Sequence, residues 1–100
     1  MPDSHLVIFH RPGPAWQSGL PFFQQPGVIE HVAHFRTLLD TNRLLMGGPF
    51  VDALAGGMMI AASGVDATEL SEFAAADPAV VSGVLVYEVR PWLVGMAATR

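Results

Sequence analysis

The sequence predicts a single α+β domain, with a four-stranded antiparallel sheet and both helices on one of its faces. Two kinds of pattern carry this prediction. Four short segments have the alternation or the branched residues of strands, and two longer segments have helical spacing with residues that favour helix ends. They follow one another as strand, helix, strand, strand, helix, strand. One hundred residues are the size of one domain, so the chain is expected to be one domain over residues 1–100.

The first strand is expected over residues 5–11. Leu6, Ile8 and His10 share one of its faces, and the opposite face is also largely apolar. A strand that is apolar on both faces is typical of the centre of a covered sheet, so this one is expected to be central.

A long loop is expected over residues 15–27, which hold Trp16, Phe22 and Phe23 among prolines and glycines. Long ordered loops in small domains are often functional. The three aromatic side chains either fold back over the edge of the core or close over a pocket. Both alternatives stay open at this stage, and the three residues are candidate ligand contacts.

The first helix is expected over residues 28–41. Its core-facing stripe is predicted at the spacing i, i+4, i+7 and i+11, which selects Val28, Val32, Phe35 and Leu39. Asn42 then favours a left-handed helix end. A strand follows over residues 44–50, and Pro49 near its end indicates an edge strand or a bulge.

The next strand, over residues 58–63, follows a short connection and is therefore expected to be antiparallel to the one before it. Asp66 is a predicted N-cap of the second helix, with Glu69 at the capping-box position. The last strand is expected over residues 83–90, and residues 93–100 are expected to form a tail of uncertain order.

This order of elements is the ferredoxin-like βαββαβ pattern. Right-handed crossovers place both helices on one face of the sheet and leave the other face bare. Because that face is expected to be apolar, a second copy of the chain is expected to cover it. The sequence thus predicts a homodimer through the open sheet face.

Composition excludes several functions. The chain is 51% hydrophobic and 14% charged, with a net charge of −4 and no cluster of basic residues, so neither nucleic acid nor an anionic membrane surface is an expected partner. No apolar run approaches the roughly 20 residues of a membrane helix. The absence of cysteine excludes a disulfide scaffold. With no basic flank at the N-terminus to suggest a signal peptide, a cytoplasmic location is expected.

Histidine is the natural candidate for chemistry near neutral pH. His31 and His34 are three residues apart and are neighbours on the first helix, with His31 at the border of the predicted core stripe. Asp77 precedes Pro78, an arrangement typical of a helix N-cap. Its alternative role is to orient and charge a histidine. Zinc sites need three or four protein ligands, and two histidines alone fall short, so no metal is expected.

The chain resembles the YCII-related family over nearly its whole length. The resemblance rests on an ordered set of segments: the N-terminal strand, residues 30–36, residues 43–50, residues 57–60, residues 76–80, and residues 83–92. The family has a ferredoxin-like fold of the dimeric α/β-barrel group, and its hallmark His–Asp pair matches His31 and Asp77. Where relatives usually carry an aromatic residue and glycine, this chain has His34 and Asn42.

The resemblance implies a site at His31 and Asp77, but it does not transfer a substrate. One branch of the family is similar to dehydrochlorinases that act on chlorinated hydroxyquinols. The first hypothesis is therefore an enzyme of lyase or isomerase type that needs no cofactor and acts on a small, partly aromatic or enolic molecule. His34, Trp16, Phe22, Phe23 and Pro49 are its expected ligand contacts. The alternatives are a binding or accessory module without turnover and a purely structural dimerisation module.

Overall fold

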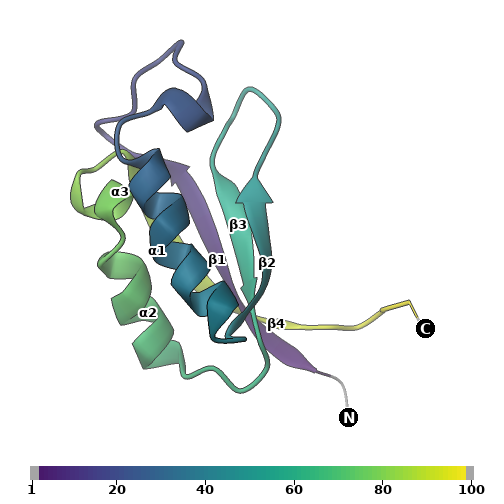
Figure 1. Cartoon of the computed structure of the whole chain (residues 1–100). Helices are drawn as coiled ribbons and strands as arrows, with labels where there is room; N and C mark the ends of the chain where they lie inside the picture. Colours follow the sequence, from purple (N-terminus) through teal and green to yellow (C-terminus); the bar gives the residue numbers. More distant parts are fainter. Residues whose placement is uncertain (1–2, 99–100) are drawn as a thin grey trace.

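The computed structural model describes residues 3–98, and its centre is one four-stranded antiparallel sheet (Figure 1). The strand order is β2-β3-β1-β4, with every neighbouring pair antiparallel. The strands are β1 (Ser4–Pro12), β2 (Leu44–Pro49), β3 (Gly57–Ala61) and β4 (Leu85–Leu93). The predicted central position of the first strand is confirmed. This α+β arrangement is compatible with a ferredoxin-like fold.

The helices are α1 (Val28–Asp40), α2 (Ala67–Ala75) and the short α3 (Pro78–Val81), with a 3₁₀ turn η1 (Phe22–Gln24) before α1. Figure 1 shows α1 and α2 side by side over the same face of the sheet. The main core lies between these layers, where Phe35 and Leu38 of α1 and Leu70 of α2 meet Ile8 and Met59 of the sheet. None of the helices in residues 3–98 is long and apolar enough to cross a membrane.

The predicted helix ends are confirmed. Asp66 accepts a hydrogen bond from the Glu69 amide at the start of α2, over 3.0 Å. Asn42 follows α1 with a φ of 59°, the left-handed conformation that Asn tolerates better than most side chains. Pro49 lies on β2, an edge strand whose pairing with β3 shifts register between Leu44 and Met46. Of the two alternatives indicated by Pro49, the edge strand is therefore present, whereas the irregularity lies at the opposite end of β2.

The predicted core stripe of α1 is wrong in phase. The buried residues are Val28, His31, Phe35 and Leu38, at i, i+3, i+7 and i+10. Val32 is half-buried, and Leu39 is 40% exposed. Turning the helix in this way puts His31 in the middle of the buried face rather than at its border. A polar ring is tolerated there because Asp77 bonds to it.

The C-terminal strand begins at Leu85 rather than at residue 83 and ends at Leu93 rather than at residue 90. Pro91, Trp92 and Leu93 continue β4 and pair with the start of β1, and the Val94 amide donates to Asp3 O over 2.9 Å. The expected tail of residues 93–100 is thus a strand end at Leu93, followed by irregular chain to residue 98. The rest of the predicted tail, residues 99–100, lies outside the described residues.

The long loop before α1 is held by a buried glutamine. The Gln25 side-chain amide donates to Gln17 O and Leu20 O, each over 2.7 Å, and its carbonyl accepts from the Gln17 amide over 2.9 Å. One side chain therefore satisfies three backbone groups of the loop. This fixes where the loop aromatic residues lie.

Candidate acid–base site

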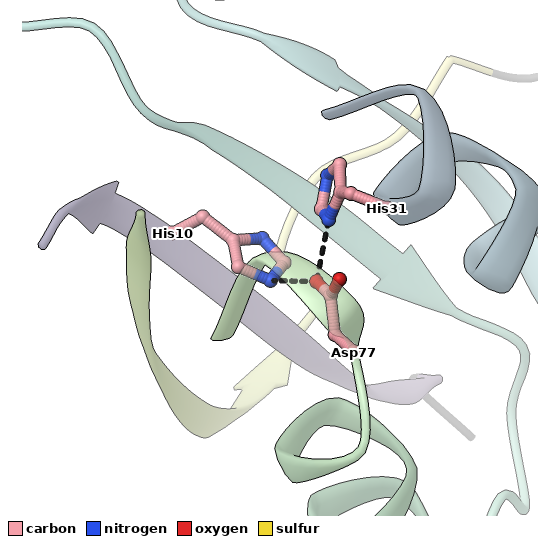
Figure 2. A group of neighbouring side chains, drawn as sticks. All are labelled: His10, His31 and Asp77. Carbon is pink, nitrogen blue, oxygen red and sulfur yellow. Dashed lines mark hydrogen bonds and ion pairs between the residues drawn. The ribbon is translucent and has the colours of Figure 1, made fainter. Parts of the chain in front are cut away.

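Asp77 and His31 form a buried pair. His31 Nδ1 lies 2.5 Å from Asp77 Oδ2, and the two residues are 3% and 0% exposed (Figure 2). An ionised carboxylate only accepts hydrogen bonds, so Nδ1 carries the proton and donates it. The other ring nitrogen, Nε2, then holds the free electron pair. No residue in 3–98 hydrogen bonds to His31 Nε2.

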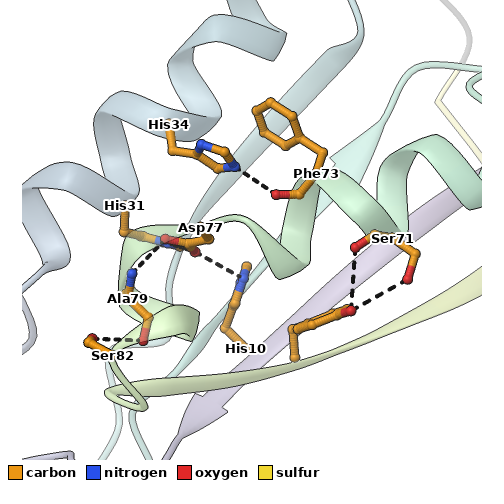
Figure 3. Close-up of polar contacts among 9 residues, drawn as sticks. His10, His31, His34, Ser71, Phe73, Asp77, Ala79 and Ser82 are labelled. Atoms are coloured by element: carbon orange, nitrogen blue, oxygen red, sulfur yellow. Dashed lines mark hydrogen bonds and ion pairs between the residues drawn. The ribbon is translucent and has the colours of Figure 1, made fainter.

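The second oxygen of Asp77 makes a backbone contact. Oδ1 accepts from the Ala79 amide over 2.9 Å and caps α3, with Pro78 in its first turn (Figure 3). The two roles that the sequence left as alternatives for Asp77, cap and partner of a histidine, are both present. The cap holds the carboxylate in one orientation, so its other oxygen, Oδ2, stays aimed at His31 on α1.

His10 is the third member of this cluster. It is 2% exposed on β1, and its Nε2 lies 3.8 Å from Asp77 Oδ2. Its ring packs edge-on against His31, with centroids 4.9 Å apart, and against Phe35, with centroids 5.5 Å apart. Within residues 3–98, His10 Nε2 is the one buried side-chain nitrogen or oxygen without a hydrogen-bond partner. Leaving such an atom unsatisfied costs roughly 1–3 kcal/mol.

His10 is neutral around pH 7. Burial lowers its pKa from 6.5 to about 4, His31 nearby adds to the lowering, and the Asp77 carboxylate opposes it. The apolar surroundings disfavour a charged imidazolium more than the carboxylate 3.8 Å away favours it. The cluster thus contains a carboxylate, a neutral imidazole on β1, and an imidazole on α1 that is bonded to the carboxylate.

A cavity of about 510 Å³ opens beside the two histidines. Its walls are α1, β2 and the start of β3, with η1 at one end. His10 and His31 are among its lining residues, which are otherwise mostly apolar. Gly57 keeps two strands close there, because a Cβ on it would come within 2.6 Å of Gly48 O. A mostly apolar hollow with a few polar groups is typical of small-molecule sites.

The structure divides the residues predicted to contact a ligand. Phe22, Phe23 and Pro49 line the cavity. Trp16 lies outside its lining and packs with Phe22 against the small cluster of Ala79, Val84 and Leu85.

His34 is also outside the cavity lining. Its Nε2 bonds to Phe73 O over 2.7 Å, and its ring stacks on the Phe73 ring at 3.9 Å (Figure 3). These contacts tie α1 to α2. The structure therefore gives the two histidines of α1 different surroundings, a carboxylate for His31 and a neighbouring helix for His34.

Two polar lining residues were not predicted from the sequence as site residues. His10 was placed on the face of its strand that carries Leu6 and Ile8, and a lone histidine on an apolar strand face is the only signal that singles it out. Arg36 lies one turn after Val32 on α1. It is the only Lys, Arg, Asp or Glu among the described residues that line the cavity.

The fold and the cluster define a class: small α+β proteins with one antiparallel sheet and a buried His–Asp pair beside an apolar cavity. No protein-family model matches the chain. Over 70 residues it is 36% identical to the uncharacterized protein YjpA of Bacillus subtilis (strain 168), an alignment that covers 70% of this chain and 80% of YjpA. The chain therefore belongs to the family of YjpA.

Proposed function

We propose that this protein is an enzyme of lyase or isomerase type that transfers a proton through His31 on a small molecule. One observation carries the proposal: the His31–Asp77 pair is buried, yet His31 lines a cavity of ligand size. A histidine held by a carboxylate is a common general base, because the carboxylate fixes its tautomer and stabilises the cation formed when it takes a proton.

In this reaction His31 Nε2 removes a proton from the ligand, and the electron pair of the broken bond stays on the ligand. In a lyase reaction this pair forms a double bond as a leaving group departs with its own bonding pair. In an isomerase reaction His31 returns the proton to a different atom. Each step uses only the imidazole and the carboxylate of this chain, in line with the expectation of a reaction without a cofactor.

The lining suggests the shape of the ligand. Apolar and aromatic walls favour a flat or branched carbon skeleton, and Phe22 and Phe23 are among the aromatic lining residues. Arg36 favours a ligand with a negatively charged or strongly polar group. A small, partly aromatic or enolic acid meets both conditions, and such molecules also have protons that a histidine can remove.

We further propose that the chain is YCII-related and forms a homodimer of the α/β-barrel type in the cytoplasm. Support for the dimer comes from the sheet face opposite the helices. Alternation along paired strands places Phe9, Met58 and Ile60 on that face, with Met46 61% exposed and Trp92 45% exposed at its edges. These apolar side chains lie beside charged ones on β4, among them Glu88 and Arg90, and such exposed apolar groups favour an interaction surface.

A turnover screen tests the enzymatic proposal. Wild-type protein in EDTA is incubated with a panel of quinols, muconolactones and halogenated hydroxy-aromatic acids, and products are followed by mass spectrometry. We expect at least one compound to be converted, with conversion lost in His31→Gln and kept in Glu30→Gln, which changes an exposed carboxylate on the same helix. Conversion that survives in His31→Gln would contradict the proposal.

A binding module without turnover is the second candidate, favoured by the same cavity. Saturable binding of a panel member without conversion, weakened by Arg36→Gln but not by Arg43→Gln, would select it. Absence of both binding and turnover would leave a structural dimerisation module.

A further inference from the structure

The starting observation is the buried Nε2 of His10. It is sealed from solvent, and no residue in 3–98 gives it a hydrogen bond. Buried polar atoms in folded proteins are nearly always paired, and an exception calls for a partner such as an ion or a water molecule. His34, by contrast, has its Nε2 satisfied by a backbone carbonyl. The atom that lacks a partner is therefore the one aimed at Asp77.

Three ligand-type atoms converge at this point. His10, His31 and Asp77 each offer one such atom, and these atoms all lie within 4.8 Å of one another. Figure 2 shows the imidazole of His10 and that of His31 each turning a nitrogen toward the same carboxylate, from β1 and α1 respectively. The three residues come from different elements, and all are buried.

We propose that His10, His31 and Asp77 form a binding site for one divalent transition-metal ion, with Zn²⁺ as the ion to test. Two imidazoles and one carboxylate are a common ligand set for such ions. Three protein ligands leave a further position, as at sites that take an exchangeable fourth ligand. Both histidines also line the cavity, so the site lies at the cavity wall.

The three ligand atoms, all within 4.8 Å of one another, lie close to the spacing that a bound ion requires. Two ligand atoms on one Zn²⁺ ion, each about 2.0–2.2 Å from it, lie about 3–4 Å apart. The His10–Asp77 distance of 3.8 Å already falls in this range, whereas the 2.5 Å contact between His31 Nδ1 and Asp77 Oδ2 has to open. The Ala79 amide holds the other oxygen of Asp77, so the carboxylate keeps a second partner that orients it.

Metal binding and proton transfer are alternative states of these side chains. An ion on Nδ1 of His31 replaces the proton there, and the neutral ring then carries its proton on Nε2. Nε2 no longer has a free electron pair toward the cavity. The metal site stands on the geometry alone and does not rest on the proposed reaction.

Isothermal titration of EDTA-treated, dialysed protein with ZnCl₂ at pH 7.5 tests the site. We expect one ion per chain, with affinity reduced at least about tenfold by each of His10→Asn, His31→Asn and Asp77→Asn. The matched controls are His5→Asn and His34→Asn, which alter the two histidines outside the cluster and should bind Zn²⁺ as the wild type does. Equal affinity in all five variants, or no binding by wild type, would overturn the proposal.

A second measurement needs no variant and so does not depend on mutant folding. Long-range ¹H–¹⁵N NMR spectra of the wild-type histidine rings are recorded before and after one equivalent of Zn²⁺. The ring nitrogens of His10 and His31 should shift, while those of His5 and His34 stay in place. Shifts confined to His5 or His34 would show binding elsewhere and contradict the site. Since the turnover screen is run in EDTA, its failure and the failure of this site are separate results.

Discussion

Asp77 uses its two oxygens for two different contacts, and only a carboxylate can accept at both. Oδ1 accepts from the Ala79 amide and Oδ2 from His31 Nδ1. Asparagine keeps one acceptor and turns an NH₂ group toward the other partner. From the sequence the cap was recognisable through Pro78, whereas the contact with His31 joins residues 46 positions apart and came only from a family resemblance.

The double role of Asp77 predicts unequal costs for two substitutions. Asp77→Ala loses the cap, worth about 1 kcal/mol, and leaves His31 Nδ1 without its acceptor, worth roughly 1–3 kcal/mol. Asp77→Asn retains the cap, so its loss of unfolding free energy should be smaller by about 1 kcal/mol or more. Urea denaturation followed by circular dichroism measures both. Equal losses would mean that Oδ1 contributes no cap.

His10 predicts how stability depends on pH. Its folded pKa is about 4 and its unfolded reference is 6.5, so between these values the unfolded chain binds the proton and the folded chain does not. The contribution of neutral His10 to the unfolding free energy is therefore fully present above pH 6.5 and is lost as the pH falls toward 4. The loss is up to about 3 kcal/mol, at 1.36 kcal/mol per pKa unit. In EDTA, the unfolding free energy of wild type should fall more steeply across this window than that of His10→Asn. Parallel curves would contradict the buried, neutral His10.

At the scale of elements, helical spacing predicted that α1 exists but not which way it faces. The apolar residues Val32 and Leu39 fit a stripe, yet the sheet buries His31 and Leu38 instead. A stripe predicted from spacing includes only apolar residues. It therefore misses a histidine that is buried because a residue of another element, here Asp77, forms a hydrogen bond with it. Val32 and Leu39 are left to line the cavity. The burial of His31 against Asp77 therefore explains both the wrong phase of the predicted stripe and the position of the site.

The end of α1 gives a prediction for a single backbone position. Asn42 is exposed with a φ of 59°, where a side chain such as alanine is disfavoured by roughly 1–2 kcal/mol and glycine is not. Asn42→Ala should lower the unfolding free energy by about 1 kcal/mol, because Asn tolerates this conformation better than Ala does. Asn42→Gly should change it by only a few tenths of a kcal/mol. Thermal denaturation of wild type and both variants measures these differences. An Asn42→Ala variant as stable as wild type would argue against the left-handed helix end.

For the whole molecule, the order of elements was enough to predict the sheet and the face that the helices cover. Short connections make neighbouring segments antiparallel, and the helix caps at Asp66 and Asn42 are local signals. The shift of register in β2 and the extension of β4 through Pro91 are not local, because both depend on pairing with a neighbouring strand. The homodimer stays a prediction.

Light scattering tests the dimer. At micromolar concentration the mass should be about twice the 10.7 kDa of one chain. Ile60→Asp places a charge on the open sheet face and should shift the mass toward the monomer, because an isolated charge is costly in an apolar interface. Ile29→Asp is the matched control, since Ile29 is 76% exposed on α1, away from that face. A monomeric wild type would sink the dimer proposal.

The proposed reaction requires that Asp77 hold His31 with its proton on Nδ1 and a free electron pair on Nε2. Long-range ¹H–¹⁵N NMR reads this directly, in EDTA at a pH of about 9, where an ordinary imidazole with a pKa of about 6.5 is neutral. Wild-type His31 should show Nδ1 protonated and Nε2 bare. In Asp77→Asn the pattern should reverse, because the amide keeps its oxygen on Ala79 and turns its NH₂ group toward Nδ1. A wild-type His31 with its proton on Nε2, or the same tautomer in both proteins, would show that Asp77 does not set the tautomer of His31.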